Sequence, residues 1–216
     1  MTQIFIFGAS VAYGAKAEKA GWADLLKQSL QAKMYSEHSF GEQYELYNFA
    51  QPGAKAEFVL VTHADQLKFY RRSGKIIAIV CVGGNNIKAE NKPNIFTSSV
   101  KEYGQVMAQL LKKLSDTVDE LIVLPSLVAV DESKTKPESD PRTGVRSYFS
   151  NDRIVLFNQE LKKLSDEVGA RYVAIDVSPK EWAEKYLYAD GLHPNQAGHQ
   201  YIFETVIKVV DELLSS

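Results

Sequence analysis

The stretch KIIAIVCV, Lys75–Val82, is followed directly by Gly83, Gly84, Asn85 and Asn86. Its apolar run has the length of a strand and is rich in β-branched residues, which is typical of a strand that is buried on both faces. Such strands occur in parallel sheets whose two faces are covered by helices. This stretch therefore indicates an α/β fold, with a polar turn at the carboxyl end of one strand.

The rest of the chain repeats this alternation. Apolar runs of strand length alternate with longer segments whose apolar residues recur at three- and four-residue spacing, as in amphipathic helices. The expected strands are Gln3–Phe7, Tyr44–Phe49, Lys75–Val82, Glu120–Leu124 and Arg171–Ile175. The expected helices are Trp22–Lys33, Ala56–Tyr70, Ser98–Leu114, Asp152–Val168 and Asn195–Leu214. The pattern predicts a five-stranded parallel sheet with helices on both faces.

Length and charge restrict the class of protein. The chain has 216 residues, of which 45% are hydrophobic, so its length suits a single α/β domain over residues 1–216. The 25 Lys and Arg residues against 27 Asp and Glu residues give a formal net charge of -2. A nucleic-acid binder would be expected to carry a basic excess instead, so we expect a small-molecule partner and no nucleic acid. The oligomeric state is left open.

The sequence also bears on redox state and location. The single cysteine, Cys81, excludes an internal disulfide and is interpreted as a small buried hydrophobic residue. No stretch approaches the roughly 18 apolar residues of a membrane-spanning helix. The N-terminus lacks the basic segment and small-residue cleavage site of a signal peptide, so the sequence predicts a cytoplasmic protein. A chain from which a signal had been removed would look the same.

Candidate site residues follow the first two strands. In open α/β sheets the ligand crevice lies beyond the carboxyl ends of the strands. After the first strand, Gly8-Ala9-Ser10 would present Ser10 at a helix start, where either a nucleophile or a helix cap is expected. After the second strand, Gly53 allows a sharp turn that could aim a backbone N–H outward, or it is simply a turn glycine.

Two further segments complete the set. Asn85 and Asn86 place amide side chains after the third strand, although Gly and Asn are also common in plain loops. Before the last helix, the segment DGLHP (Asp190–Pro194) places a carboxylate three residues from an imidazole. Asp190 could set the tautomer of His193 and stabilise its charged form, or it could cap a turn. Because all four segments fall on one edge of the predicted sheet, together they favour a nucleophile, two oxyanion donors and a base.

Other chemistries have less support. His38, His63 and His199 show no metal-ligand spacing and are interpreted as surface or helix-packing residues, so we expect no metal. The phosphate loop G-x-x-x-x-G-K-[ST] and the dinucleotide motif G-x-G-x-x-G are both missing, and we expect no cofactor. The G-x-S-x-G elbow of the α/β-hydrolase family is also missing.

Taken together, the four segments resemble the SGNH hydrolases, also called the GDSL esterase and lipase family, over nearly the whole chain. The family's blocks correspond to Gly8-Ala9-Ser10, Gly53, Gly83-Gly84-Asn85-Asn86 and Asp190–Pro194. The resemblance implies a flavodoxin-like three-layer sandwich. It also implies a serine esterase, a carboxylic ester hydrolase that acts through an acyl-enzyme on Ser10.

The resemblance implies a role for each site residue. Asp190 orients His193, and His193 takes the proton of Ser10 as its oxygen attacks an ester carbonyl. The backbone N–H groups of Ser10 and Gly53 and the side-chain amide of Asn85 form the oxyanion hole.

The sequence departs from the family's pattern at two positions, because Ala9 and Asn86 stand where the family usually has Asp. Those carboxylates support hydrogen bonding around the active-site loops, so their replacement bears on rate and loop rigidity before it bears on reaction type. Two alternatives stay open. One is an acyltransferase that passes the same acyl group to an alcohol, and the other is a non-catalytic relative that binds carbohydrate or lipid.

One long irregular segment, Val128–Ser150, follows the fourth expected strand. It is longer than an ordinary connection and begins at the crevice edge of the sheet, so we expect a lid or wall over the site. Tyr148 and Phe149 could form an apolar wall for an acyl chain. A passive insertion is the alternative, because Lys, Glu, Ser and Pro dominate the centre of the segment.

Overall fold

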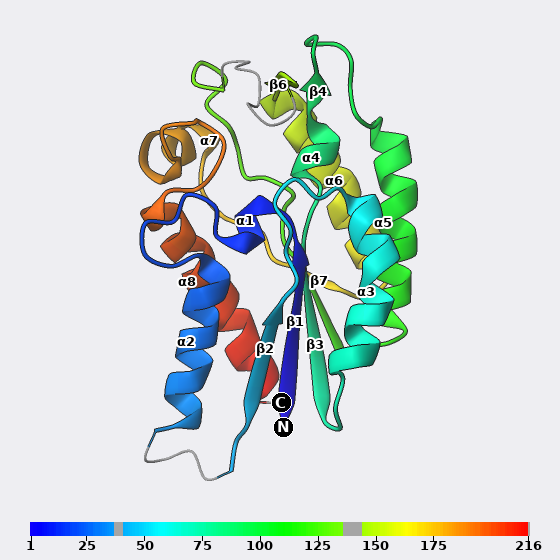
Figure 1. The fold of residues 1–216 in the computed structure, drawn as a ribbon, viewed down its shortest axis with the longest axis vertical. Helices are drawn as coiled ribbons and strands as arrows, with labels where there is room; N and C mark the ends of the chain where they lie inside the picture. Colours follow the sequence, from blue (N-terminus) through cyan, green and yellow to red (C-terminus); the bar gives the residue numbers. More distant parts are fainter. Residues whose placement is uncertain (37–40, 136–143, 216) are drawn as a thin grey trace.

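The computed structural model describes residues 1–36, 41–135 and 144–215. Its main sheet has five parallel strands in the order β2-β1-β3-β5-β7 (Figure 1). The strands are β1 (Thr2–Gly8), β2 (Tyr44–Asn48), β3 (Lys75–Cys81), β5 (Glu120–Val123) and β7 (Arg171–Tyr172). This is the strand order of flavodoxin-like folds, in which the connections reverse direction between β1 and β3. The predicted five-stranded parallel sheet is confirmed.

Helices cover both faces of this sheet (Figure 1). On one face lie α2 (Trp22–Met34) and α8 (Gln196–Leu214), which pack against each other. On the other face, α5 (Val100–Ser115) packs between α3 (Ala56–Tyr70) and α6 (Asn151–Glu167). The three-layer sandwich is therefore confirmed, and the bounds of all five helices lie close to those expected from their periodicity.

The core is divided into two apolar layers by the sheet. Successive side chains of a strand point to opposite faces, and in β1 both faces are apolar. Phe5 and Phe7 belong to the layer beneath α3 and α5, whereas Ile4 and Ile6 belong to the layer beneath α2 and α8. All four are at most 1% exposed. Burying each such side chain contributes about 1.5–3 kcal/mol, so polar groups are excluded from this part of β1 until the strand ends at Gly8.

The structure contains short elements that the sequence pattern did not predict, because they are too brief to show a period. The last strand, β7, is also shorter than expected, since it lies at the edge of the sheet and pairs only with β5. The additional elements are α1 (Ser10–Tyr13), α4 (Gly84–Ile87), the antiparallel pair β4 (Ala89–Glu90) and β6 (Ser147–Tyr148), and α7 (Pro179–Glu181), which continues into a π-helix at Trp182–Tyr186.

His199, a residue of α8, joins three distant parts of the chain. Its ring is fully buried. Its Nε2 donates a hydrogen bond to the carbonyl of Ala15 (3.1 Å), so its Nδ1 is free to accept one from the backbone N–H of Trp22 (3.4 Å). Burial lowers the pKa of His199. The neutral ring thus connects α8 to the start of α2 and to the loop that follows α1.

We expect His199 to make the protein less stable in mild acid. The pKa of this imidazole in the folded protein lies below the value of about 6.5 in the unfolded chain, so the unfolded chain binds more protons as the pH falls. The stabilisation is fully present above about pH 6.5 and is lost as the pH falls toward the folded pKa. His199→Gln should therefore show a lower free energy of unfolding at about pH 8, and a weaker fall toward about pH 5, than the wild type. Urea unfolding across this range measures both, and the same pH dependence in the two proteins would contradict the prediction.

Candidate active site

The predicted site residues meet at the carboxyl edge of the sheet, beside β1 and β3, where the connections reverse direction. Ser10 begins α1 directly after β1, and Asn85 lies in α4 directly after β3. His193 lies in the loop before α8 and is separated from Ser10 by 183 residues in the chain. These residues and Gly53 line one cavity, which has a volume of about 390 Å³.

His193 connects the side chains of Ser10 and Asp190. Its Nε2 lies 2.9 Å from Ser10 Oγ, and its Nδ1 lies 2.8 Å from Asp190 Oδ2. Because an ionised carboxylate can only accept a hydrogen bond, Nδ1 carries the hydrogen and the Nε2 of the neutral ring accepts one from the Ser10 hydroxyl. This arrangement can remove a proton from the serine.

Asp190 is held in its charged form. Burial would raise the pKa of Asp190, but hydrogen bonds from the His193 ring and from the backbone N–H groups of His193 and Leu192 lower it to about 2. The two backbone hydrogen bonds, each 3.0 Å long, go to Oδ1, and the ring hydrogen bond goes to Oδ2. Asp190 therefore both caps its turn and orients the imidazole, so the two alternatives considered from the sequence occur together.

Ser10 is the first residue of α1, and the N-cap of this helix is Ala9. The alternative interpretation of Ser10 as a helix cap is therefore wrong, and its hydroxyl is directed at His193 instead. The first N–H groups of a helix have no partner within the helix, so the backbone of Ser10 can offer a donor next to its own hydroxyl. Ala9 contributes no side-chain hydrogen bond to this helix start.

Gly53 lies in a tight turn of residues 51–54. The N–H of Ala54 donates to the carbonyl of Gln51 (3.0 Å), and Gly53 has a φ of 84°, a conformation that glycine adopts far more readily than other residues. Gly53 is exposed, and a Cβ added to it would have no atom within 4 Å. It is thus a turn glycine whose backbone also borders the cavity.

The two asparagines after β3 point in different directions. Asn85 lines the cavity, and its Nδ2 donates one hydrogen bond to the carbonyl of Ala54 (3.0 Å), which leaves the second hydrogen of the amide for a ligand. Asn86 is fully buried and does not line the cavity. The expectation that both amides lie beside the crevice is therefore wrong for Asn86.

Polar residues of α6 support the loops around the site, and the sequence analysis missed them. The guanidinium of Arg153 donates to the carbonyls of Ile87 (2.8 Å) and Ser98 (2.7 Å). Asn158 Oδ1 accepts a hydrogen bond from the backbone N–H of Ser126 (3.0 Å), after β5. The only available signal was the presence of large polar residues in an amphipathic helix, which is equally typical of a solvent-exposed face.

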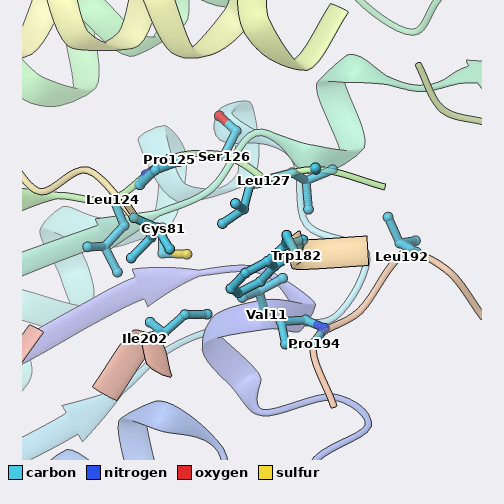
Figure 2. A pocket seen from close by; sticks show the side chains of 13 residues that line it. Val11, Cys81, Leu124, Pro125, Ser126, Leu127, Trp182, Leu192, Pro194 and Ile202 are labelled. Carbon is cyan, nitrogen blue, oxygen red and sulfur yellow. The ribbon is translucent and has the colours of Figure 1, made fainter. Parts of the chain in front are cut away.

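Figure 2 shows the side chains that line a second, smaller cavity, which shares part of its wall with the first. Its volume is about 20 Å³, measured as the space that the centre of a water-sized sphere can reach. It therefore has room for about one water molecule or one methyl group. Its wall is almost entirely apolar and includes Trp182 and Ile202, so it favours the methyl group. Burial raises the pKa of Cys81, which lines both cavities, to about 12, so its thiol stays protonated. The residues shared by the two cavities are Val11, Cys81, Ser126, Leu127 and Leu192.

The long irregular segment predicted as a lid or wall is described at both ends, and residues 136–143 lie outside the described residues. At one end, Val128 lines the small cavity. At the other end, Phe149 lines the larger cavity, whereas Tyr148 pairs with Ala89 in the two-stranded sheet. The described ends of the segment thus contribute Val128 to the wall of the small cavity and Phe149, but not Tyr148, to the wall of the larger one.

The other histidines lie away from these cavities or outside the structure. His63 is buried in α3, where its Nδ1 contacts the carbonyls of Val59 (3.1 Å) and Leu60 (3.0 Å), and His38 lies outside the described residues. Within residues 1–36, 41–135 and 144–215, no three His, Cys, Asp or Glu side chains gather as a set of metal ligands. Over the same ranges, no helix has both the length and the hydrophobicity needed to cross a bilayer.

The sheet order and the cleft at its carboxyl edge define a flavodoxin-like α/β fold with a candidate active site, and the sequence assigns the chain to a family within that fold. It matches the model of the GDSL-like lipase/acylhydrolase family over residues 6–201, so the chain belongs to this family. The predicted resemblance is confirmed, and with it the assignment to the carboxylic ester hydrolases. A comparison with curated proteins finds no match.

Solved structures share the fold over nearly their whole length. The lipase/acylhydrolase from Enterococcus faecalis has a TM-score of 0.70 at 16% identity, with 97% of this chain and 95% of that chain covered. The psychrotrophic esterase EstA from Pseudoalteromonas sp. has a TM-score of 0.68 at 16% identity, with 99% of each chain covered. An acetylxylan esterase from Geobacillus stearothermophilus has a TM-score of 0.66 at 14% identity, with 95% and 92% covered. At these identities the likeness shows a common fold.

Gly191 lies in the turn between Asp190 and His193 and packs tightly. Its φ is 69°, and an added Cβ would lie 2.7 Å from Lys134 Cβ and 2.9 Å from the carbonyl oxygen of Asp131. The same Asp131 donates its backbone N–H to the carbonyl of Gly191 (2.8 Å). The turn that carries the imidazole therefore rests on residues 131–135.

We expect Gly191→Ala to impair both stability and ester hydrolysis. Gly169 is a matched control, because its φ is 71° but an added Cβ would meet nothing within 4 Å. Both variants should lose about 1–2 kcal/mol from the left-handed backbone conformation. Only Gly191→Ala should also displace the His193 turn and lower kcat/KM by about tenfold or more. Urea unfolding and hydrolysis of nitrophenyl acetate measure the two effects, and equal kcat/KM in the two variants would be evidence against this role of the turn.

Proposed function

We propose that this protein is a serine esterase that cleaves a carboxylic ester of a small molecule, sugar or lipid through an acyl-enzyme on Ser10. The observation that carries the proposal is the continuous chain of hydrogen bonds from Ser10 through His193 to Asp190, which opens on a cavity. A serine hydroxyl is a weak nucleophile unless an adjacent base removes its proton. Here the base is within hydrogen-bonding distance, and a carboxylate orients it.

In the first half of the reaction, His193 Nε2 takes the hydroxyl proton while Ser10 Oγ bonds to the ester carbonyl carbon. The carbonyl then re-forms as its bond to the alcohol oxygen breaks, and the departing alcohol takes the proton from Nε2. Water repeats the sequence on the acyl-enzyme and releases the acid. Asp190 stays ionised throughout, consistent with its pKa of about 2, and stabilises the imidazolium that forms in each half.

Three donors would stabilise the oxyanion. They are the backbone N–H groups of Ser10 and Gly53 and the second hydrogen of the Asn85 amide. Fixed donors of this kind act where negative charge develops, and the loss of one costs about 100- to 1000-fold in turnover.

The two cavities suggest which part of the substrate binds where. The larger cavity has more room and is bordered by several polar residues, including Ser10, Lys16 and Asn85, so it suits the alcohol part of the ester. The smaller cavity suits an acyl group, because it is bordered by Val11, the residue after Ser10, and has an apolar wall with room for about one methyl group. We therefore propose a short acyl group. Short acyl groups also occur in the substrate named for one structural relative, the acetylxylan esterase.

Substitution of Ser10 tests the reaction. Ser10→Ala should abolish ester hydrolysis and leave the free energy of unfolding nearly unchanged, because the hydroxyl lies at the edge of a cavity and not in the core. A fluorophosphonate should add covalently to Ser10 in the wild type, since among the described residues this hydroxyl is the one bonded to an imidazole. Mass spectrometry of the labelled peptide locates the adduct. Turnover by purified Ser10→Ala, or an adduct on another residue, would exclude the serine mechanism proposed here.

Substitution of Val11 tests the acyl cavity. Val11 lines both cavities, so Val11→Ala should widen the passage between them and admit longer acyl chains. Each extra buried CH₂ contributes about 0.8 kcal/mol, so the ratio of kcat/KM for nitrophenyl butyrate to that for the acetate should rise severalfold. Val61→Ala is the control, because Val61 also lies in a helix but is 76% exposed on α3. If both variants keep the wild-type ratio, the small cavity does not bind the acyl group.

A further inference from the structure

Asn86 is a fully buried polar side chain whose hydrogen bonds lead back to the oxyanion side of the site. Its Oδ1 accepts a hydrogen bond from the backbone N–H of Ala56 (2.9 Å). Its Nδ2 donates to Glu57 Oε2 (2.9 Å) and to Ser98 Oγ (3.1 Å). Both hydrogens of the amide are thus in use, and the side chain joins α4 to the first turn of α3.

The orientation of this amide follows from its partners. A backbone N–H can only donate, so the N–H of Ala56 must face the oxygen of Asn86. An ionised carboxylate can only accept, so Glu57 must face the nitrogen. Ser98 does not decide the orientation, since a hydroxyl can both donate and accept. Asn86 and Glu57 therefore form a matched pair in which one side chain must donate and the other must accept.

The pair lies next to two of the proposed oxyanion donors. Asn86 follows Asn85 in α4, and Asn85 Nδ2 is bonded to the carbonyl of Ala54 (3.0 Å), beside Gly53. Ala56 and Glu57, which are bonded to Asn86, begin the helix that follows this turn. Two adjacent asparagines thus hold the segment 54–57 from opposite sides, one at the cavity and one within the core.

We infer that Asn86 and Glu57 are positioning residues that set the Gly53 turn and the Asn85 amide at the spacing needed to bind an oxyanion. This inference rests on the proposed esterase function and adds two residues that do not touch the substrate. It also predicts that an amide is required at position 86. An aspartate there would keep the hydrogen bond from Ala56, but its second oxygen would face the carboxylate of Glu57 at hydrogen-bonding distance.

The repulsion would be specific to Glu57. The Ser98 hydroxyl can rotate to donate to an aspartate, and the backbone N–H of Ala56 continues to donate. Two carboxylates in such close contact are strongly destabilising unless one is neutral. Relief therefore requires only that residue 57 become a donor, which a glutamine supplies.

The test is a two-residue exchange measured by the kinetics of nitrophenyl acetate hydrolysis. Asn86→Asp should lower kcat by about tenfold or more with little change in KM, because displaced oxyanion donors act in the transition state and not in ground-state binding. Glu57→Gln alone should lower kcat less than Asn86→Asp does, since its amide can still turn an acceptor oxygen to Asn86. The double variant should recover kcat to within about threefold of the wild type, because the new amide at position 57 can then donate to the new carboxylate at position 86.

Asp119→Asn is a matched control for Glu57→Gln, because it also replaces a carboxylate by an amide. Asp119 Oδ2 accepts a hydrogen bond from the backbone N–H of Ile76 (2.7 Å), at the opposite edge of the sheet from the site. This variant should change the thermal unfolding temperature but not kcat. Circular dichroism melts of every variant separate unfolding from a loss of positioning.

Each outcome bears on the inference. Wild-type kcat in Asn86→Asp, or a double variant as slow as Asn86→Asp, would overturn it while leaving the esterase function intact. If Asn86→Asp does not fold, recovery of both folding and kcat in the double variant supports the pairing, and failure of the double variant to fold refutes it. A wild-type protein that hydrolyses no ester would overturn the proposed function, and this inference with it.

Discussion

The central strand β1 is paired on both sides and covered on both faces, and the site depends on this constraint. Ile4 and Ile6 fill one apolar layer and Phe5 and Phe7 the other, so no polar side chain can be accommodated along this part of the strand without a large cost in desolvation. A hydroxyl that is to meet a ligand is therefore expected beyond the end of the strand. Ser10 lies there, directly after Ala9, whose backbone N–H donates a hydrogen bond to the carbonyl of Cys81 in β3.

The site around Ser10 has two sides that are built from different parts of the chain. The side that carries the proposed base is a tight turn, Asp190 to His193, which is supported by residues 131–135 and by the start of α8. The side that we propose binds the oxyanion consists of α4 and the turn before α3, which Asn85 and Asn86 connect through hydrogen bonds. Arg153 of α6 fixes the backbone of the oxyanion side through two carbonyl groups. Rigid helices in the outer layer thus hold loops that have little regular structure of their own.

The main elements of the fold could be predicted because burial imposes a period on the sequence. Strands covered on both faces become continuous apolar runs, and helices covered on one face show apolar residues at every third or fourth position. Elements shorter than one period give no such signal. This is why α1, α4 and the pair β4–β6 were missed, and why β7, an edge strand of two residues, was expected to be longer.

The sequence alone determined the fold class and the family, and it placed Ser10, Gly53, Asn85 and His193 at one edge of the sheet, because the carboxyl ends of parallel strands meet there whatever the loops between them do. Only the tertiary structure decided how the side chains at that edge are directed. Asn85 and Asn86 are chemically identical neighbours, yet one lines the cavity and the other is buried against Glu57. The physical reason is that a side chain in a loop takes its direction from the hydrogen bonds available around it, and those partners come from segments distant in the chain.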